Sequence, residues 1–347
     1  MERKKRKTVY LEILRFIAIF GVLFCHTGYN GVFHYLETDN RINYWFGIFL
    51  VSISQYCVPL FFMITGALLV KRKESLSYVL KHRVLKMLIV IFGAVLMQYL
   101  WNYRQNPAIG LDGKTYLRLV YEGSATTPHW FLYTYLSLML VLPFLQRLAE
   151  IIPHKNWFVY LFLVWQLIYG FFPILEYYQE WENSPLSLPM FADCIIFCLL
   201  GYFTECCTED TFYKGKNVLI LFGVTVLLIL ETMHMNYISL SEYPFACYGK
   251  LFAPVYALFI FVTVRYLCHK LHFTPALEKV CCFVGGGVFG TYLAGEVLLQ
   301  IFYPVYLWLS TRIHAYPAAF VWISVCMAVG VLLSNLVKKI PGIGKLI

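Results

Sequence analysis

The chain has 347 residues, of which 60% are hydrophobic, 18% aromatic and only 14% charged, and its formal net charge is +9. This composition excludes an ordinary water-soluble domain. The positive charge does not indicate a nucleic-acid partner, because most Lys and Arg residues fall in segments predicted to face the cytoplasm, as the positive-inside rule describes. Apolar runs of membrane-spanning length recur along the chain and predict an all-α integral membrane protein.

One membrane domain is predicted over residues 10–337, between a basic cytoplasmic N-terminal tail, 1–9, and a cytoplasmic C-terminal tail, 338–347. We expect a polytopic bundle of about ten transmembrane helices with both termini in the cytoplasm. The 11 Cys residues are expected to be small packing residues rather than a disulfide framework. The predicted spans are residues 10–28, 44–70, 84–101, 129–145, 157–175, 188–203, 218–235, 251–268, 283–302 and 318–337.

The first predicted span carries Glu12, Arg15 and His26. An ionisable side chain inside the bilayer costs about 2.5–3.5 kcal/mol, so these three are expected to face away from lipid. At 100° per residue, Arg15 and His26 lie within about 20° of each other around a helix, and Glu12 lies one turn before Arg15 on nearly the same stripe. Two plainer interpretations stay open: Glu12 and Arg15 as anchors at the membrane interface, and His26 as a packing residue.

A dense basic cluster follows the second span, in the segment KRKESLSYVLKHRVLK. Arg72, Arg83 and Lys86 are the cations of this cluster that we single out. Arg suits bidentate phosphate contacts, whereas Lys acts as a point charge. The alternative is that the cluster sets the topology and binds lipid headgroups, which we prefer for residues 71–73.

The longest external connection is predicted at residues 102–127, with a partly amphipathic piece around Tyr116–Tyr121. His129 and Trp130 then open the next span at its external end. They are candidates for a binding site at this end, although an aromatic residue at a helix end more commonly belongs to the interfacial belt. The acidic, aromatic loop around Trp181 is expected to be solvated.

The late span 283–302 contains Glu296 in its middle, with Gln300 one turn further on. A carboxylate at this depth is too costly to face lipid, so Glu296 either completes an active site or makes a buried polar contact. Asp193, in the span 188–203, is a weaker candidate of the same kind. The late span is also rich in Gly, which permits close approach of neighbouring helices.

In this order, the landmarks resemble the membrane acyltransferase 3 family, the transmembrane acyltransferases that modify cell-envelope glycans. The resemblance covers essentially the whole chain, and Arg15 and His26 look like the family's Arg-x10-His signature. Three further segments of this chain resemble family motifs: Phe61-Phe62-Met63-Ile64-Thr65-Gly66, Arg83-Val84-Leu85-Lys86 and His129-Trp130-Phe131-Leu132. In the first, this chain has Thr where the family has Ser, and in the second it has Lys where the family has Arg.

The chain departs from the family pattern at one place. Relatives often have Tyr-Leu-x-His near the start of a late helix, whereas this sequence reads Tyr292-Leu293-Ala294-Gly295, followed by Glu296. Whatever that His does in relatives is therefore absent here or falls to Glu296.

The resemblance implies transfer of an acetyl group from cytoplasmic acetyl-CoA to a hydroxyl of a surface glycan or its lipid-linked precursor, at the cell membrane. Such transfer needs a base for the hydroxyl proton, and His26 suits this task because imidazole titrates near neutrality. Direct attack and an acyl-histidine intermediate both stay open. No metal is expected. The other expected site residues are Arg15 and Glu12 for catalysis, Arg72, Arg83 and Lys86 for the donor, and His129, Trp130 and Glu296 for the acceptor.

Other functions stay open at this point. An exporter of a glycan or a transporter of a small solute would also need polar residues near the bilayer midplane, although no inverted repeat is apparent. A third reading is a membrane module that acts in trans with a separate soluble enzyme. Membrane lipids are expected partners, nucleic acid is not, and association with a second copy of the chain stays open.

Overall fold

The computed structural model describes residues 2–151, 155–179, 192–206, 214–239, 249–271 and 273–346. All regular structure in these ranges is helical. Apolar segments in hydrocarbon become helices because lipid offers no hydrogen-bond partner to a backbone N–H or C=O group. The main helices are α1 (Glu2–Cys25), α2 (Arg41–Ser54), α3 (Cys57–Leu69), α5 (Leu85–Gln105), α7 (Trp130–Ile151), α8 (Lys155–Gln166), α9 (Phe172–Gln179), α10 (Asp193–Cys206), α12 (Gly215–Ser239), α13 (Gly249–Lys270), α14 (Pro275–Ile301), α15 (Tyr303–Ser310) and α16 (Ala315–Val337).

In the described part of the chain, 8 helical segments are long and apolar enough to cross a membrane. They coincide with eight of the predicted spans. The first and sixth predicted spans are also helical, as α1 and α10, but neither is among these 8 segments. The protein is therefore an all-helical integral membrane protein, while the count of about ten spans and the cytoplasmic position of both termini stay predictions.

The predicted span 44–70 is interrupted in its middle, where α2 ends at Ser54 and α3 begins at Cys57. The cause is Pro59, which has no N–H for the carbonyl of Gln55 and whose ring would clash with that carbonyl. Gln55 and Cys57 both line the cavity described below. Irregular backbone at membrane depth is tolerated where it lines such a cavity.

Two glycines allow α3 and α10 to pack backbone against backbone. A Cβ at Gly66 would lie 1.7 Å from the carbonyl oxygen of Cys198, and a Cβ at Gly201 would lie 1.9 Å from that of Met63. Any larger residue at either position would force the helices apart. Gly66, the glycine of the Phe61–Gly66 motif, therefore has a packing role.

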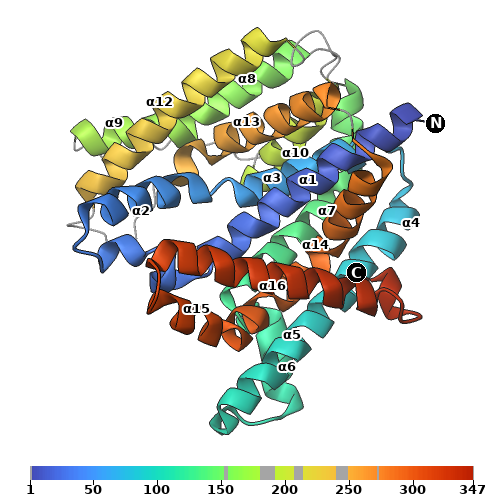
Figure 1. Ribbon diagram of the computed structural model, residues 1–347. Helices are drawn as coiled ribbons and strands as arrows, with labels where there is room; N and C mark the ends of the chain where they lie inside the picture. Colours follow the sequence, from blue (N-terminus) through green and yellow to red (C-terminus); the bar gives the residue numbers. More distant parts are fainter. Residues whose placement is uncertain are drawn as a thin grey trace.

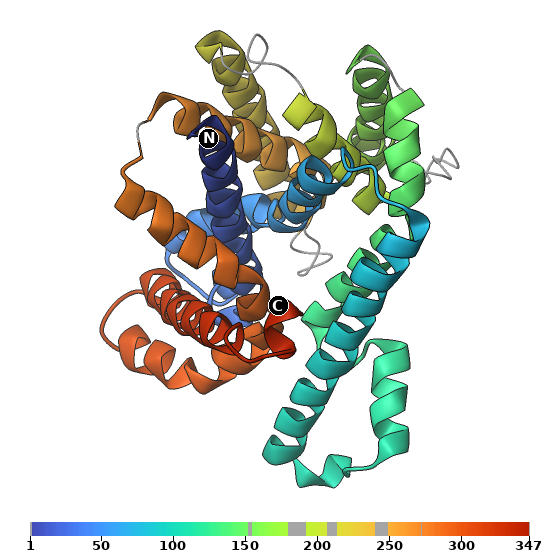
Figure 2. The same cartoon turned by 90° about the vertical axis from the view of Figure 1, so that its right-hand side faces the viewer.

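The helix α1 crosses the bundle obliquely and contacts α3, α13, α14 and α16 (Figure 1). Its approach to α14 depends on Gly285, where a Cβ would lie 2.8 Å from the Cα of Glu12. The helix α5, with the shorter helix α6 (Gly113–Glu122) beside it, extends away from the rest of the bundle (Figure 2). The amphipathic piece predicted around Tyr116–Tyr121 is thus helical, and Tyr116 donates its hydroxyl hydrogen to the carbonyl of Phe92 at 2.9 Å.

Candidate functional site

An elongated cavity of about 740 Å³ is lined by residues of α1, α3, α5, α7 and α14. Along α1, the lining residues Arg15 and His26 are about 16 Å apart at 1.5 Å per residue. The lining also contains two polar groups of residues. One group, called the basic end below, comprises Arg72, His82, Arg83, Lys86 and Lys338; the other, called the His26 end, comprises His26, Gln55, Pro128 and Trp130.

The predicted stripe of α1 faces this cavity, since Arg15, Val22 and His26 all line it. Glu12 holds Arg15 in place, because Nη1 of Arg15 donates to both carboxylate oxygens, at 2.6 and 2.8 Å. The side chains of Arg15 and Glu12 are 29% and 15% exposed. Both hydrogen bonds use the same guanidinium nitrogen, so the rest of the Arg15 fork stays available to a group inside the cavity.

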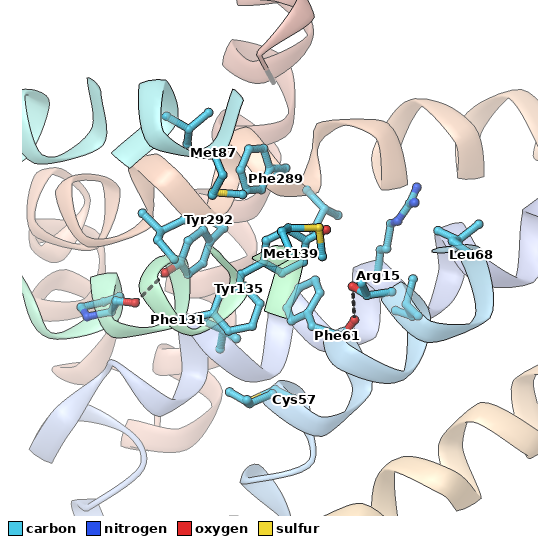
Figure 3. A pocket seen from close by; sticks show the side chains of 18 of the residues that line it. Arg15, Cys57, Phe61, Leu68, Met87, Phe131, Tyr135, Met139, Phe289 and Tyr292 are labelled. Atoms are coloured by element: carbon cyan, nitrogen blue, oxygen red, sulfur yellow. Dashed lines mark hydrogen bonds between the residues drawn. The ribbon is translucent and has the colours of Figure 1, made fainter. Parts of the chain in front are cut away.

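Aromatic side chains form the middle of the cavity (Figure 3). The ring of Phe131 lies at their centre, 5.8 Å from Phe61, 6.0 Å from Tyr135 and 5.5 Å from Tyr292. Phe289 completes this section from α14. Apolar walls here separate the charged basic end from the His26 end and leave a passage suited to an uncharged chain.

Tyr292 also fixes the start of α7. Its hydroxyl donates to the carbonyl oxygen of Pro128 at 2.5 Å, and Pro128 precedes α7 by two residues. This hydrogen bond ties α14 to the turn that carries Trp130. Tyr292, the first residue of the late-helix motif, therefore positions one wall of the His26 end.

The basic end brings together the three predicted donor-binding residues, Arg72, Arg83 and Lys86. Arg83 lies in a π-helical turn, η3 (Leu80–Val84), and it forms a two-pronged ion pair with Glu74, from Nε at 2.6 Å and Nη2 at 2.5 Å. Hydrogen bonding to Arg83 holds the pKa of Glu74 below its ordinary value. Nη1 of Arg72 lies 3.8 Å from the same carboxylate.

At the opposite end, His26 shares a small recess of about 10 Å³ with Glu296. A chain of two hydrogen bonds holds the carboxylate of Glu296. Its Oε1 accepts a hydrogen bond from Nε2 of Gln300 at 3.2 Å, and Oε1 of Gln300 accepts one from Nε1 of Trp101 at 2.6 Å. Glu296 and His26 thus line the same recess, and no described carboxylate oxygen lies within 4.0 Å of a His26 ring nitrogen.

The structure separates the two predicted acceptor residues at the start of α7. Trp130 lines the cavity and is 48% exposed. His129 is 3% exposed and is not among the cavity-lining residues, and its Nδ1 has no hydrogen-bond partner among the described residues. A contact between His129 and a ligand in this cavity would require His129 to move.

Several cavity residues were not singled out from the sequence. Tyr135 follows Phe131 by one helical turn, so the period of α7 could have indicated it. Lys338 and Leu346 line the basic end from beyond α16, although 338–347 was read as a tail. No local sequence pattern connects these residues to Lys86. Trp181, the proposed loop aromatic, lies outside the described residues, and Asp193 is exposed at the start of α10.

No group of three or more His, Cys, Asp or Glu residues in the described ranges could hold a metal ion. The arrangement instead offers cations at one end, an apolar passage, and an imidazole beside a carboxylate at the other end. The fold and the site together define a polytopic membrane protein with an internal cavity that is basic at one end.

Residues 8–341 match the sequence model of the family described as "acyltransferase domain", which is the acyltransferase 3 family. The chain belongs to this family, and the predicted resemblance is confirmed. No curated protein and no solved structure matches the chain.

Proposed function

We propose that this chain is an O-acetyltransferase of the cell membrane. It transfers the acetyl group of cytoplasmic acetyl-CoA to a hydroxyl of a surface glycan or of the lipid-linked precursor of that glycan. The observation that carries the proposal is that a single cavity connects the basic end to His26.

The polarity of the cavity supports this orientation of the donor. The nucleotide of acetyl-CoA is polyanionic, so it is placed at the basic end, where Lys86 and its neighbours attract phosphate. The pantetheine arm then follows the aromatic section around Phe131, which excludes water from the path. The thioester arrives beside His26, and the acceptor hydroxyl enters past Trp130.

In the proposed reaction, Nε2 or Nδ1 of His26 takes the proton of the acceptor hydroxyl while the hydroxyl oxygen attacks the thioester carbonyl carbon. The bond between this carbon and the CoA sulfur then breaks, and the sulfur takes the proton back from the imidazolium. The products are the O-acetyl ester and free CoA thiol. Direct transfer needs no acyl-histidine intermediate.

Glu296 supports this step through charge. A carboxylate beside the imidazole stabilises the imidazolium that forms when His26 accepts the proton. Arg15, held by Glu12, lies further along the cavity and positions a polar part of the donor. Glu296 thereby replaces, in this chain, part of the role of the late His in relatives.

Membranes containing the protein provide the test. After incubation with radiolabelled acetyl-CoA, wild-type membranes should carry label in envelope glycan, released as acetate by mild alkali. His26→Ala should lower this transfer by at least about a hundredfold, because general base catalysis contributes that much. The variant should still bind acetyl-CoA, which separates loss of catalysis from loss of fold.

His314→Ala is the matched control, because His314 is exposed and lies away from the cavity lining. Its transfer rate should equal that of the wild type. Full transfer by His26→Ala would exclude His26 as the base. Wild-type membranes that move a glycan without acetylating it, and that do not bind acetyl-CoA, would instead support the exporter.

A further inference from the structure

The two arginines of the basic end are already occupied by protein groups. Both prongs of Arg83 donate to Glu74, and Nε of Arg72 donates to the carbonyl oxygen of Leu68 at 3.0 Å. Glu74 neutralises much of this positive charge, so the guanidinium groups already have protein partners in the absence of ligand. A newly arriving anion would have to compete with that carboxylate for them.

Two lysines of the basic end differ from the arginines. Lys86 projects from α5 and Lys338 from the residue after α16, and both line the same cavity. Within the described ranges, no carboxylate lies within 4.0 Å of either ammonium group. Lys338 donates a hydrogen bond to the carbonyl oxygen of Gly286, which also lines the cavity.

The electrostatic surroundings of Lys338 favour an anion. Burial lowers the pKa of Lys338, the positive charge of Arg15 lowers it further, and Glu12 acts in the opposite direction. Like charges in a confined space with apolar walls repel each other unless a counter-charge lies between them. Lys86 and Lys338 therefore form a cationic pair without a carboxylate of their own.

The chain beyond α16 is folded so that it holds Lys338 at this position. The backbone N–H of Lys338 bonds to the carbonyl of Ser334 at 3.0 Å. The chain then turns through Gly342, which has a φ of +86°, and returns so closely that a Cβ at Gly344 would lie 2.1 Å from the carbonyl oxygen of Lys338. Leu346 ends this return on the cavity wall. Lys338 and Leu346, at the two ends of this return, thus both line the site.

We propose that Lys86 and Lys338 are the primary ligands of the donor's diphosphate, and that the segment after α16 belongs to the donor site. This inference rests on the proposed function. An ammonium group binds phosphate as a point charge without fixed geometry, which suits a diphosphate entering between two helices. The Arg83–Glu74 ion pair then forms part of the wall of the basic end, and Arg83 is not the main phosphate ligand.

The test compares affinities of three compounds for the purified full-length protein in zwitterionic phosphatidylcholine nanodiscs: CoA, dephospho-CoA and pantetheine. Lys338→Met retains most of the side-chain length and removes the charge. It should weaken CoA and dephospho-CoA by about tenfold each, as expected for loss of one charge-assisted contact. Pantetheine, which lacks the diphosphate, should bind wild type and variant equally. Lys338→Arg should restore most of the affinity.

Lys339→Ala is the matched control, because Lys339 is the exposed neighbour and does not line the cavity. It should leave all three affinities unchanged. Lys86→Met should weaken CoA and dephospho-CoA to the same extent as Lys338→Met. This second variant tests the proposal even if one of the two variants fails to fold.

Three outcomes would overturn the assignment while leaving the proposed function intact. Unchanged CoA affinity in both methionine variants would show that the lysines do not bind the donor. A loss confined to CoA, with dephospho-CoA unaffected, would place the lysines at the 3′-phosphate. Phosphatidylglycerol that competes with CoA in the wild type but not in Lys338→Met would assign the pair to a lipid headgroup. Wild-type protein that binds no CoA at all would refute the proposed function itself.

Discussion

Glu296 of α14 and His26, the residue after α1, line one small recess. The pair joins residues that are far apart in the chain, and it places a carboxylate where the proposed reaction creates an imidazolium. Gln300 and Trp101 hold Glu296 from behind. The proposed base therefore has a charged partner, in addition to the stripe on its own helix.

Replacing Glu296 by Gln tests this partnership. The amide keeps the size of the side chain and can still bond to Gln300, but it removes the negative charge that stabilises the imidazolium. We expect acetyl transfer to fall by about tenfold or more, a fraction of the full contribution of a general base. The measurement is incorporation of label from radiolabelled acetyl-CoA at saturating donor. Donor affinity should be unchanged, and an unchanged rate would exclude Glu296 from the reaction.

The Glu12–Arg15 ion pair should stabilise the fold. Glu12→Gln leaves the Arg15 charge without its carboxylate inside the membrane domain, so we expect a loss of about 1–3 kcal/mol in the free energy of unfolding in detergent. The double variant Glu12→Gln, Arg15→Met should lose less free energy of unfolding than the sum of the losses in the two single variants. Each single change leaves one charge without its partner, whereas the double change removes both charges. Additive losses would show that the two side chains do not interact.

The exposed ion pair Arg118–Glu122 provides a comparison for the variants of the Glu12–Arg15 pair. Its Nε–Oε1 distance, 2.7 Å, is close to that of the Arg15–Glu12 pair, but it lies on the surface of α6. Water and salt screen such pairs. Removing Glu122 should leave the unfolding transition unchanged.

Gly66 should tolerate no side chain. In Gly66→Ala, the new Cβ would meet the backbone carbonyl of Cys198, so α3 and α10 must separate, and we expect a loss of about 1–3 kcal/mol or more. Gly93→Ala is the matched change, because no atom lies within 4 Å of its Cβ position. It should be neutral or stabilise the helix by up to about 1 kcal/mol. Equal thermal unfolding of the two variants would contradict the packing argument.

The Arg83–Glu74 ion pair predicts a pH dependence of stability. Because the pKa of Glu74 is lowered in the folded state, the pair contributes fully above the ordinary carboxyl value of 4.5 and its contribution is lost as the pH falls through the lowered value. Unfolding followed from pH 7 downwards should therefore show declining stability below about 4.5. Glu74→Gln should show a smaller decline over the same range. Identical pH profiles would mean that the pair does not stabilise the fold.

Much of the fold could be predicted, because lipid imposes a simple rule on the sequence. An apolar run without polar partners must be a helix, and eight such runs are found at the predicted positions. The break between α2 and α3 was missed, although Pro59 was visible. Pro59 shows that a helix is disturbed, but whether it kinks or separates depends on neighbouring packing.

The sequence predicts the site residues that share one helix, but not the way residues of different helices come together. Arg15 and His26 were found because helical periodicity within one segment fixes their common face. Glu296 is recognisable in the sequence as costly to expose to lipid, but its place in the same recess as His26 depends on how closely α14 approaches α1. His129 was grouped with Trp130 because they are adjacent in sequence, whereas adjacent residues of a helical turn point in different directions.

The sequence by itself determined the class of protein, the helical segments, the inward stripe of α1 and the family, since each of these follows from local composition, periodicity or motif. Only the tertiary structure decided that Glu296 and His26 line one recess, that Glu74 forms an ion pair with Arg83, and that Lys338 lines the basic end together with Lys86. These pairings depend on interhelical distances, which glycine contacts such as Gly285 against Glu12 set and which no single segment encodes.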